Sequence, residues 1–162
     1  MQVIALMLDI GKCRSWVVGI KISNKGQSDM LEWKESYSVG VDVIDKDHKI
    51  LVTLINRYLE ESRNQSPIMV HNVFRDLKNY TGFHFDREES LMAQCGYEHL
   101  EEHKKQHDAV RELLEDYSRK VTRGASKEDV ENFKDFLTSW LFNHVLVEDF
   151  KYKECMSTLD LP

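Results

Sequence analysis

From residue 42 onward, hydrophobic positions recur every three or four residues, which is the spacing of an amphipathic helix. In the first such stretch the apolar stripe contains Ile44, Leu51 and Ile55. Four stretches of this kind follow one another, over about residues 43–62, 67–94, 98–122 and 127–154. Each is long enough to be a helix of about five turns or more.

Residues at the ends of these stretches support the same boundaries. Ser66, followed by proline, fits the N-cap of the second helix, and Gly96 fits its C-terminal cap. Ser126 with Asp129 three residues later resembles a capping box at the start of the fourth helix. Because the links are short, neighbouring helices should be antiparallel. We predict an all-α, up-down-up-down four-helix bundle over residues 30–162.

Residues 1–29 differ from the rest of the chain. They are rich in β-branched residues and hold three of the seven glycines, which favours short strands or irregular structure. We interpret them as a non-helical, possibly β-like N-terminal extension of unknown role. The sequence leaves open whether this is an appendage or lies upstream of a natural start near Met30.

The charge balance narrows the choice of partners. The 162 residues carry 22 Lys and Arg against 28 Asp and Glu, a net charge of −6, which argues against binding to nucleic acid or to an anionic membrane. No apolar run approaches the about 20 residues needed to span a bilayer. A domain of this length folds without a structural metal, so a metal found here would be functional.

The three cysteines, Cys13, Cys95 and Cys155, are an odd and widely spaced set. They fit neither a disulfide framework nor a zinc motif, so we interpret them as reduced thiols. The N-terminus lacks the positive region and the cleavage site of a signal peptide. These features together predict a cytoplasmic protein.

Every predicted helix places histidine on its apolar stripe, and one adds a carboxylate. Burying an unsatisfied polar group costs roughly 1 to 3 kcal/mol, so several imidazoles in one core indicate a shared metal site. The residues that should meet inside the bundle are His48, His84, Glu88, His103, His107 and His144.

Spacing supports shared coordination. His84 and Glu88 are four residues apart, as are His103 and His107. Residues four apart are neighbours on a helix surface, about 5 to 6 Å apart at Cβ. Each pair can therefore reach one site.

The other two histidines fail this test. His71 lies about 220° around the helix from His84, and His99 sits at the end of the bundle, so we expect both on the surface. The fourth helix offers two acids after His144, and regular helical geometry alone prefers Glu148 to Asp149.

These motifs resemble the bacterial hemerythrins. The similarity covers about residues 30–156 and rests on Trp33, DVIDKDH ending at His48, HFDREE from His84, HKKQH from His103, and WLFNHVLVED from Trp140 to Asp149. The family's fourth motif, H-x4-D, selects Asp149 over Glu148. A π-bulge between His144 and Asp149 would reconcile this choice with helical geometry, and we expect one.

The resemblance implies a cofactor of two iron ions, with dioxygen as the ligand. In the family, two carboxylates and an oxygen atom bridge the irons, which implies bridging by Glu88 and Asp149. It further implies that His103, His107 and His144 bind one iron and that His48 and His84 bind the other, which keeps a position for dioxygen.

The function implied is reversible dioxygen binding for carriage, storage or delivery, without catalysis. Reversibility requires a dry pocket, for which Leu51, Ile55 and Trp140 are candidate lining residues. The alternatives are a di-iron oxidase or peroxidase, an oxygen or iron sensor, and an iron store. Ferritin-like oxidases use Glu-x-x-His pairs, which this sequence lacks, and zinc sites generally hold four ligands.

Overall fold

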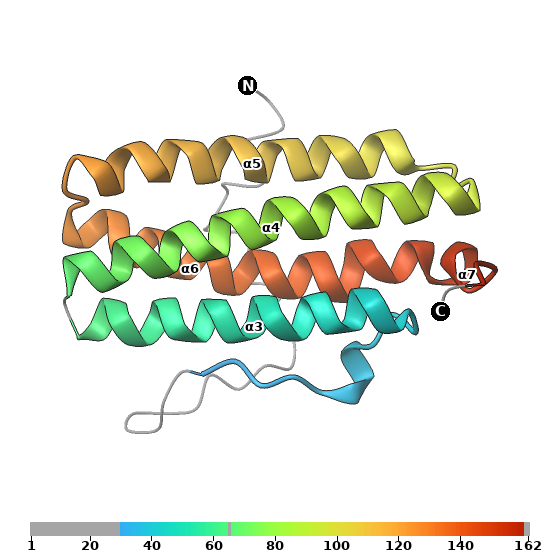
Figure 1. The fold of residues 1–162 in the computed structure, drawn as a ribbon, viewed down its shortest axis with the longest axis horizontal. Helices are drawn as coiled ribbons and strands as arrows, with labels where there is room; N and C mark the ends of the chain where they lie inside the picture. The colour runs from blue at the N-terminus through green and yellow to red at the C-terminus, as the bar shows by residue number, and fades with distance from the viewer. Residues whose placement is uncertain (1–29, 65, 161–162) are drawn as a thin grey trace. The chain divides into compact units, whose positions relative to one another are not determined.

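A computed structural model describes residues 30–64 and 66–160. Successive long helices run in opposite directions, side by side (Figure 1). They are α3 (Asp42–Arg63), α4 (Pro67–Cys95), α5 (Leu100–Thr122) and α6 (Lys127–Asn143), preceded by the short helix η1 (Glu35–Tyr37). The prediction of an all-α, up-down-up-down bundle is confirmed. The predicted strand-like extension over residues 1–29 lies outside the described residues.

Of the three helix caps that the sequence predicts, two form as expected. Ser126 and Asp129 form the predicted capping box, each side chain accepting a hydrogen bond from the other residue's backbone N–H at 3.1 Å. Gly96 ends α4 in the left-handed conformation, with φ of 74°. Ser66 stands at the N-cap of α4, but its side chain makes no capping hydrogen bond.

The fourth helix is not continuous to residue 154. After α6 the chain forms the π-helical turn η2 (His144–Glu148), the 3-10 turn η3 (Asp149–Tyr152) and the short helix α7 (Lys153–Met156). The wider turn of a π-helix fits five residues where an α-helix fits four. The expected irregularity between His144 and Asp149 is therefore confirmed.

Two apolar clusters fill the bundle interior, with a polar layer between them along the helices. The larger cluster includes the buried pair Tyr58 and Tyr117, whose hydroxyl oxygens lie 2.6 Å apart. The smaller cluster consists of Val39, Val41, Ile44, Leu91, Met92, Tyr152 and Met156. Along α3, α4, α5 and the segment α6–η2–η3, the candidate ligands His48, His84, His103, His107 and His144 lie between residues of the two clusters. Among the described residues, no helix is long and apolar enough to cross a membrane.

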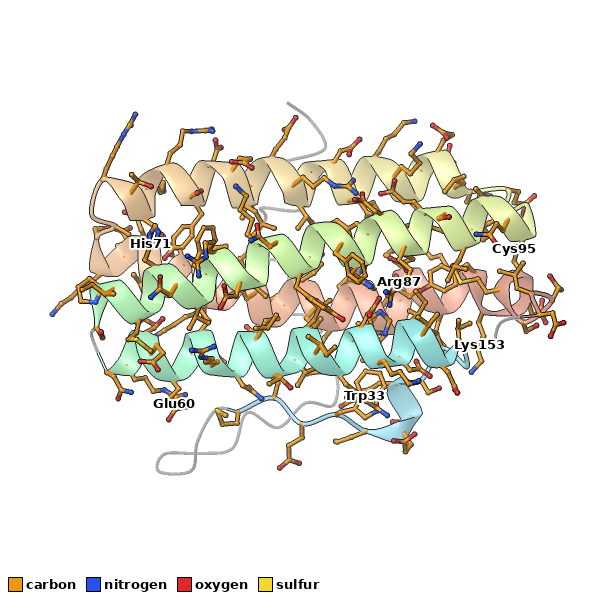
Figure 2. All side chains as sticks on the ribbon, viewed as in Figure 1. Trp33, Glu60, His71, Arg87, Cys95 and Lys153 are labelled. Carbon is orange, nitrogen blue, oxygen red and sulfur yellow. A yellow bond between two sulfur atoms is a disulfide. The ribbon has the colours of Figure 1, made fainter. Side chains whose placement is uncertain are left out.

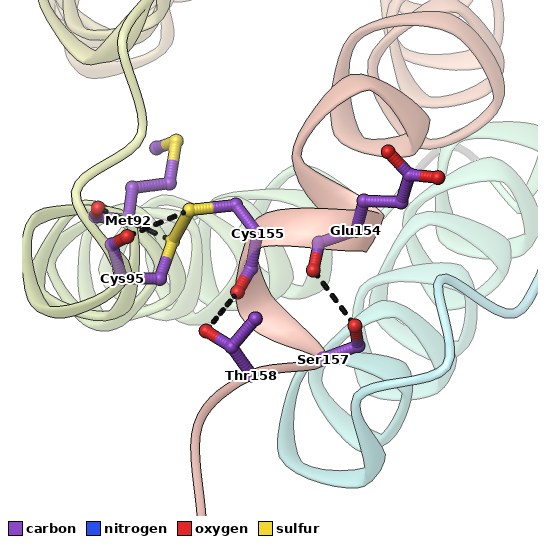
Figure 3. The surroundings of a disulfide bond; sticks show 6 residues. All are labelled: Met92, Cys95, Glu154, Cys155, Ser157 and Thr158. Atoms are coloured by element: carbon purple, nitrogen blue, oxygen red, sulfur yellow. Dashed lines mark hydrogen bonds between the residues drawn. A yellow bond between two sulfur atoms is a disulfide. The ribbon is translucent and has the colours of Figure 1, made fainter.

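The interpretation of all cysteines as reduced thiols is wrong for two of them. Cys95 and Cys155 form a disulfide, with Cα atoms 5.6 Å apart and 60 residues between them in sequence (Figure 3). The bond joins the last residue of α4 to α7. Both segments end at the same end of the bundle (Figure 1), because the second and fourth helices run in the same direction. Cys13 lies outside the described residues.

Candidate metal centre

All seven residues named as metal ligands converge in the polar layer between the two apolar clusters. His48 comes from α3, His84 and Glu88 from α4, His103 and His107 from α5, His144 from η2, and Asp149 from η3. None of the seven is more than 2% exposed. The regular spacing of four residues in α4 and α5 puts two of them on one face of each helix.

Glu88 lies at the centre of this group. Its Oε2 atom is 3.2 Å from His107 Nε2 and 3.5 Å from the Nε2 atoms of His84 and His144. Its Oε1 atom is 3.8 Å from His103 Nε2. One carboxylate thus faces four imidazoles from three different segments of the chain.

Asp149 is the second carboxylate of the layer. Its Oδ2 atom lies 3.0 Å from His48 Nε2, and its Oδ1 atom lies 3.6 Å from His103 Nε2. Two overlapping sets have one donor atom per residue within 4.8 Å of all the others, which suits metal coordination. They are Glu88, His103, His107 and His144, and His84, Glu88, His144 and Asp149.

These donor atoms have no hydrogen-bond partners. Both carboxylate oxygens of Glu88 and Asp149 are buried and unpaired, as is the Nε2 atom of every one of the five histidines. Buried polar atoms normally find partners, and each that does not costs about 1 to 3 kcal/mol. Seven such side chains aimed at one another fit a metal centre, whose cations would satisfy all of them at once.

Burial and the close contacts within the layer shift the pKa values of the candidate ligands. Burial and the nearby charge of Glu88 raise the pKa of Asp149 well above its usual value. Burial would also raise the pKa of Glu88, but the nearby imidazoles of His103, His107 and His144 bring it well below its usual value. Burial lowers the pKa values of His48 and His84, which keeps these imidazoles neutral as metal ligands must be.

The π turn decides which acid of the fourth helix faces the site. Asp149 is fully buried, whereas Glu148 is only partly buried and accepts hydrogen bonds from Gln106 and Lys151 at 2.9 and 2.7 Å. Regular geometry alone would have chosen wrongly. His71 and His99 are exposed as expected, and Figure 2 places His71 near the end of α4 opposite Cys95.

The three candidate pocket residues lie beside the layer. Leu51 and Ile55 are fully buried in the larger cluster. Trp140 is partly buried and stacks on His144, with ring centroids 5.2 Å apart. They supply apolar surface next to the candidate ligands, and a role in a ligand pocket stays a prediction.

The sequence interpretation missed polar residues just outside the layer. Glu89 Oε1 lies 2.8 Å from His107 Nδ1, and Asp47 Oδ2 lies 3.8 Å from His84 Nδ1. Arg111 and Arg87 pair with these two carboxylates. A signal existed, since each arginine follows a candidate ligand on its own helix by three or four residues.

Comparison with known proteins agrees with this site. Residues 39–155 match the family model described as the hemerythrin HHE cation binding domain. The bacteriohemerythrin of Clostridium acetobutylicum is 29% identical over 127 residues, covering 76% of this chain and 98% of that protein. The bacteriohemerythrin of Pseudomonas aeruginosa strain UCBPP-PA14 is 32% identical over 127 residues, covering 78% of this chain and 81% of that protein.

Two further relatives extend the comparison. The hemerythrin of Phascolopsis gouldii is 30% identical over 125 residues, covering 77% of this chain and 92% of that protein. A crystal structure of wild-type hemerythrin has the same fold, with a TM-score of 0.70 at 22% identity, over 80% of this chain and 99% of that one. With its four-helix bundle and its buried cluster of histidines and carboxylates, the chain belongs to the hemerythrin family.

Proposed function

We propose that this protein binds dioxygen reversibly at a non-heme di-iron site and acts in its carriage, storage or delivery. The observation that carries the proposal is the group of seven buried side chains with unpaired donor atoms. The names of the relatives, hemerythrin and bacteriohemerythrin, support the choice of iron and dioxygen.

We assign the residues to two metal positions, with His144 and Glu88 common to both sets of close donor atoms. His103, His107 and His144 share one set of mutually close donor atoms with Glu88, and would hold the first iron. His84 shares a second set with Asp149, which also lies 3.0 Å from His48, so these two histidines would hold the second iron. Glu88 belongs to both sets, and Asp149 Oδ1 also lies 3.6 Å from His103 Nε2, so these two carboxylates would help to hold both irons.

Iron bound here would supply the electrons for reversible reduction of dioxygen. The surrounding chain excludes water, because Leu51 and Ile55 are fully buried and Trp140 covers the ring of His144. A dry surrounding limits the access of water and protons to the site. A site with five imidazoles and two carboxylates favours binding over the oxidase chemistry of carboxylate-rich bundles.

The test is a cycle of reduction, oxygenation and deoxygenation. The protein is loaded with ferrous iron without oxygen, exposed to dioxygen and then flushed with inert gas. We expect two irons per chain and a visible absorption band that forms and disappears over repeated cycles. Dioxygen consumption that depends on an added organic substrate would contradict the proposal in favour of an oxidase, and failure to bind iron would contradict both.

Iron retention should depend on pH in one direction. Burial places the pKa values of His48 and His84 below the ordinary 6.5, so at pH 7 both are neutral and bind metal without releasing protons. We expect full iron content from pH 8 to about pH 6.5 and progressive loss in more acidic solution, where protons compete for the imidazoles. Iron measured after desalting at each pH checks this, and release at alkaline pH would contradict it.

A further inference from the structure

Glu89 and Arg111 form a connected pair next to one candidate ligand. Glu89 Oε1 lies 2.8 Å from His107 Nδ1 and accepts a hydrogen bond of 3.0 Å from Arg111 Nη1. Since His107 turns Nε2 toward Glu88, its Nδ1 carries the hydrogen and donates to Glu89. The imidazole and the guanidinium therefore compete for the same oxygen atom.

Asp47 and Arg87 form a parallel pair beside a second candidate ligand. Asp47 is 1% exposed, and its Oδ2 lies 3.8 Å from His84 Nδ1, which makes no hydrogen bond, so Asp47 acts on this imidazole by its nearby charge. Arg87 Nη1 donates to both carboxylate oxygens of Asp47, at 2.8 and 3.0 Å, and Tyr80 donates to Oδ1 at 2.7 Å. Here too an arginine donates hydrogen bonds to the carboxylate that faces an imidazole.

Both arginines sit at the boundary between core and solvent. The side chains of Arg111 and Arg87 are 31% and 32% exposed. Arg111 is also held from outside by Asp86 at 2.8 Å and Asp108 at 3.0 Å. Figure 2 shows Arg87 between His71 and Cys95 along α4, nearer to Cys95. Neither arginine is a candidate ligand, and the hydrogen-bonded link from each to a candidate ligand's neighbourhood runs through the carboxylate.

We propose that Arg111 and Arg87 are positioning residues that set the electron-donating strength of His107 and His84 through Glu89 and Asp47. This inference rests on the proposed di-iron function. A carboxylate that accepts the Nδ1 hydrogen makes the imidazole a stronger donor to metal. A guanidinium sharing that carboxylate weakens the effect. The arginines thus favour the ferrous form, which is the form that takes up dioxygen.

The test compares the reduction potential of iron-loaded variants. Arg111→Gln leaves Glu89 with its full charge for His107, and should lower the midpoint potential by stabilising ferric iron. Glu89→Gln removes the charge and should raise the potential, and it should also speed iron transfer to a chelator by about 10-fold. Arg111→Lys should restore the potential toward the wild-type value.

Matched controls separate this effect from general disturbance. Asp108→Asn removes an Arg111 contact without touching Glu89 or His107, and should leave the potential unchanged. Arg87→Gln should lower the potential as Arg111→Gln does. Phe83→Leu removes the stacking of Arg87 on the Phe83 ring, 4.4 Å away, and the ring contact of Phe83 with Tyr80, but leaves both hydrogen bonds from Arg87 to Asp47, and should not lower the potential.

The outcomes distinguish this inference from the proposed function. If the wild type loads two irons and binds dioxygen reversibly, but the Glu89 and Arg111 variants shift the potential in the same direction or not at all, the inference is wrong and the function stands. If the wild type retains no iron, the proposed function fails and the inference fails with it.

Discussion

Replacing Glu88 by glutamine is expected to abolish retention of both metal ions while the bundle stays folded. The Oε atoms of Glu88 face four histidines at 3.2 to 3.8 Å, so both proposed iron positions depend on its charge. Loss of a hydrogen-bonding partner outside the ligands already costs 10- to 100-fold in metal affinity, so loss of a bridging carboxylate should cost more than about 100-fold. Metal content after desalting and the far-ultraviolet circular dichroism spectrum measure the two effects.

Glu148→Gln is the matched control for this substitution. Glu148 is the carboxylate that regular helical geometry would have chosen, yet it pairs with Gln106 and Lys151 outside the layer. Its replacement should leave two irons per chain. Equal loss of metal from both variants, or none from Glu88→Gln, would show that the donor atoms have been assigned to the wrong carboxylate.

Reduction of the disulfide should lower the free energy of unfolding by about 2 to 4 kcal/mol. The bond closes a loop with a sequence separation of 60 residues between Cys95 and Cys155, and so restricts the unfolded chain strongly. Urea denaturation of the metal-free protein, with and without a reductant, measures the difference. The midpoint should move to lower urea concentration when the reductant is present.

The variant with both Cys95→Ser and Cys155→Ser provides the control. Its stability should match that of the reduced wild type and should not respond to reductant. Cys13 is present in both proteins, so any response through that thiol would appear in the variant as well. A wild-type midpoint that does not move on reduction would contradict a stabilising role for the bond.

Most of the fold was predictable because the bundle is built from long, regular helices. The periodicity gave α3, α4 and α5 to within two residues at each end. The same periodicity separated His71 from the core histidines, because helical phase is set locally. Helical phase did not identify Asp149 as the inward-facing acid, because a π turn changes the angle per residue. The choice of Asp149 over Glu148 required the family's motif.

The disulfide and the carboxylates beside the candidate ligands depend on contacts between helices, which spacing along one helix cannot reveal. Cys95 and Cys155 lie on different helices, and their proximity follows only once both helices are known to end together. The spacing of Arg87 and Arg111 marks these positions only weakly, because Asp47 and Glu89 each lie close to a histidine of a neighbouring helix. A charge next to a ligand in sequence is usually solvated, and only tertiary structure shows otherwise.

The π turn in η2 lets the fourth helical segment accommodate one extra residue. Because the extra residue is contained within the turn, Leu137 before it and Tyr152 after it are both buried. Val147 lies within the turn and is 48% exposed. A deletion there would shorten the turn to the four-residue spacing of an ordinary α-helix, with the same faces still directed inward. In α6 before the turn, a lost residue would rotate the segment that follows by about 100° and turn His144 and Asp149 away from the other candidate ligands.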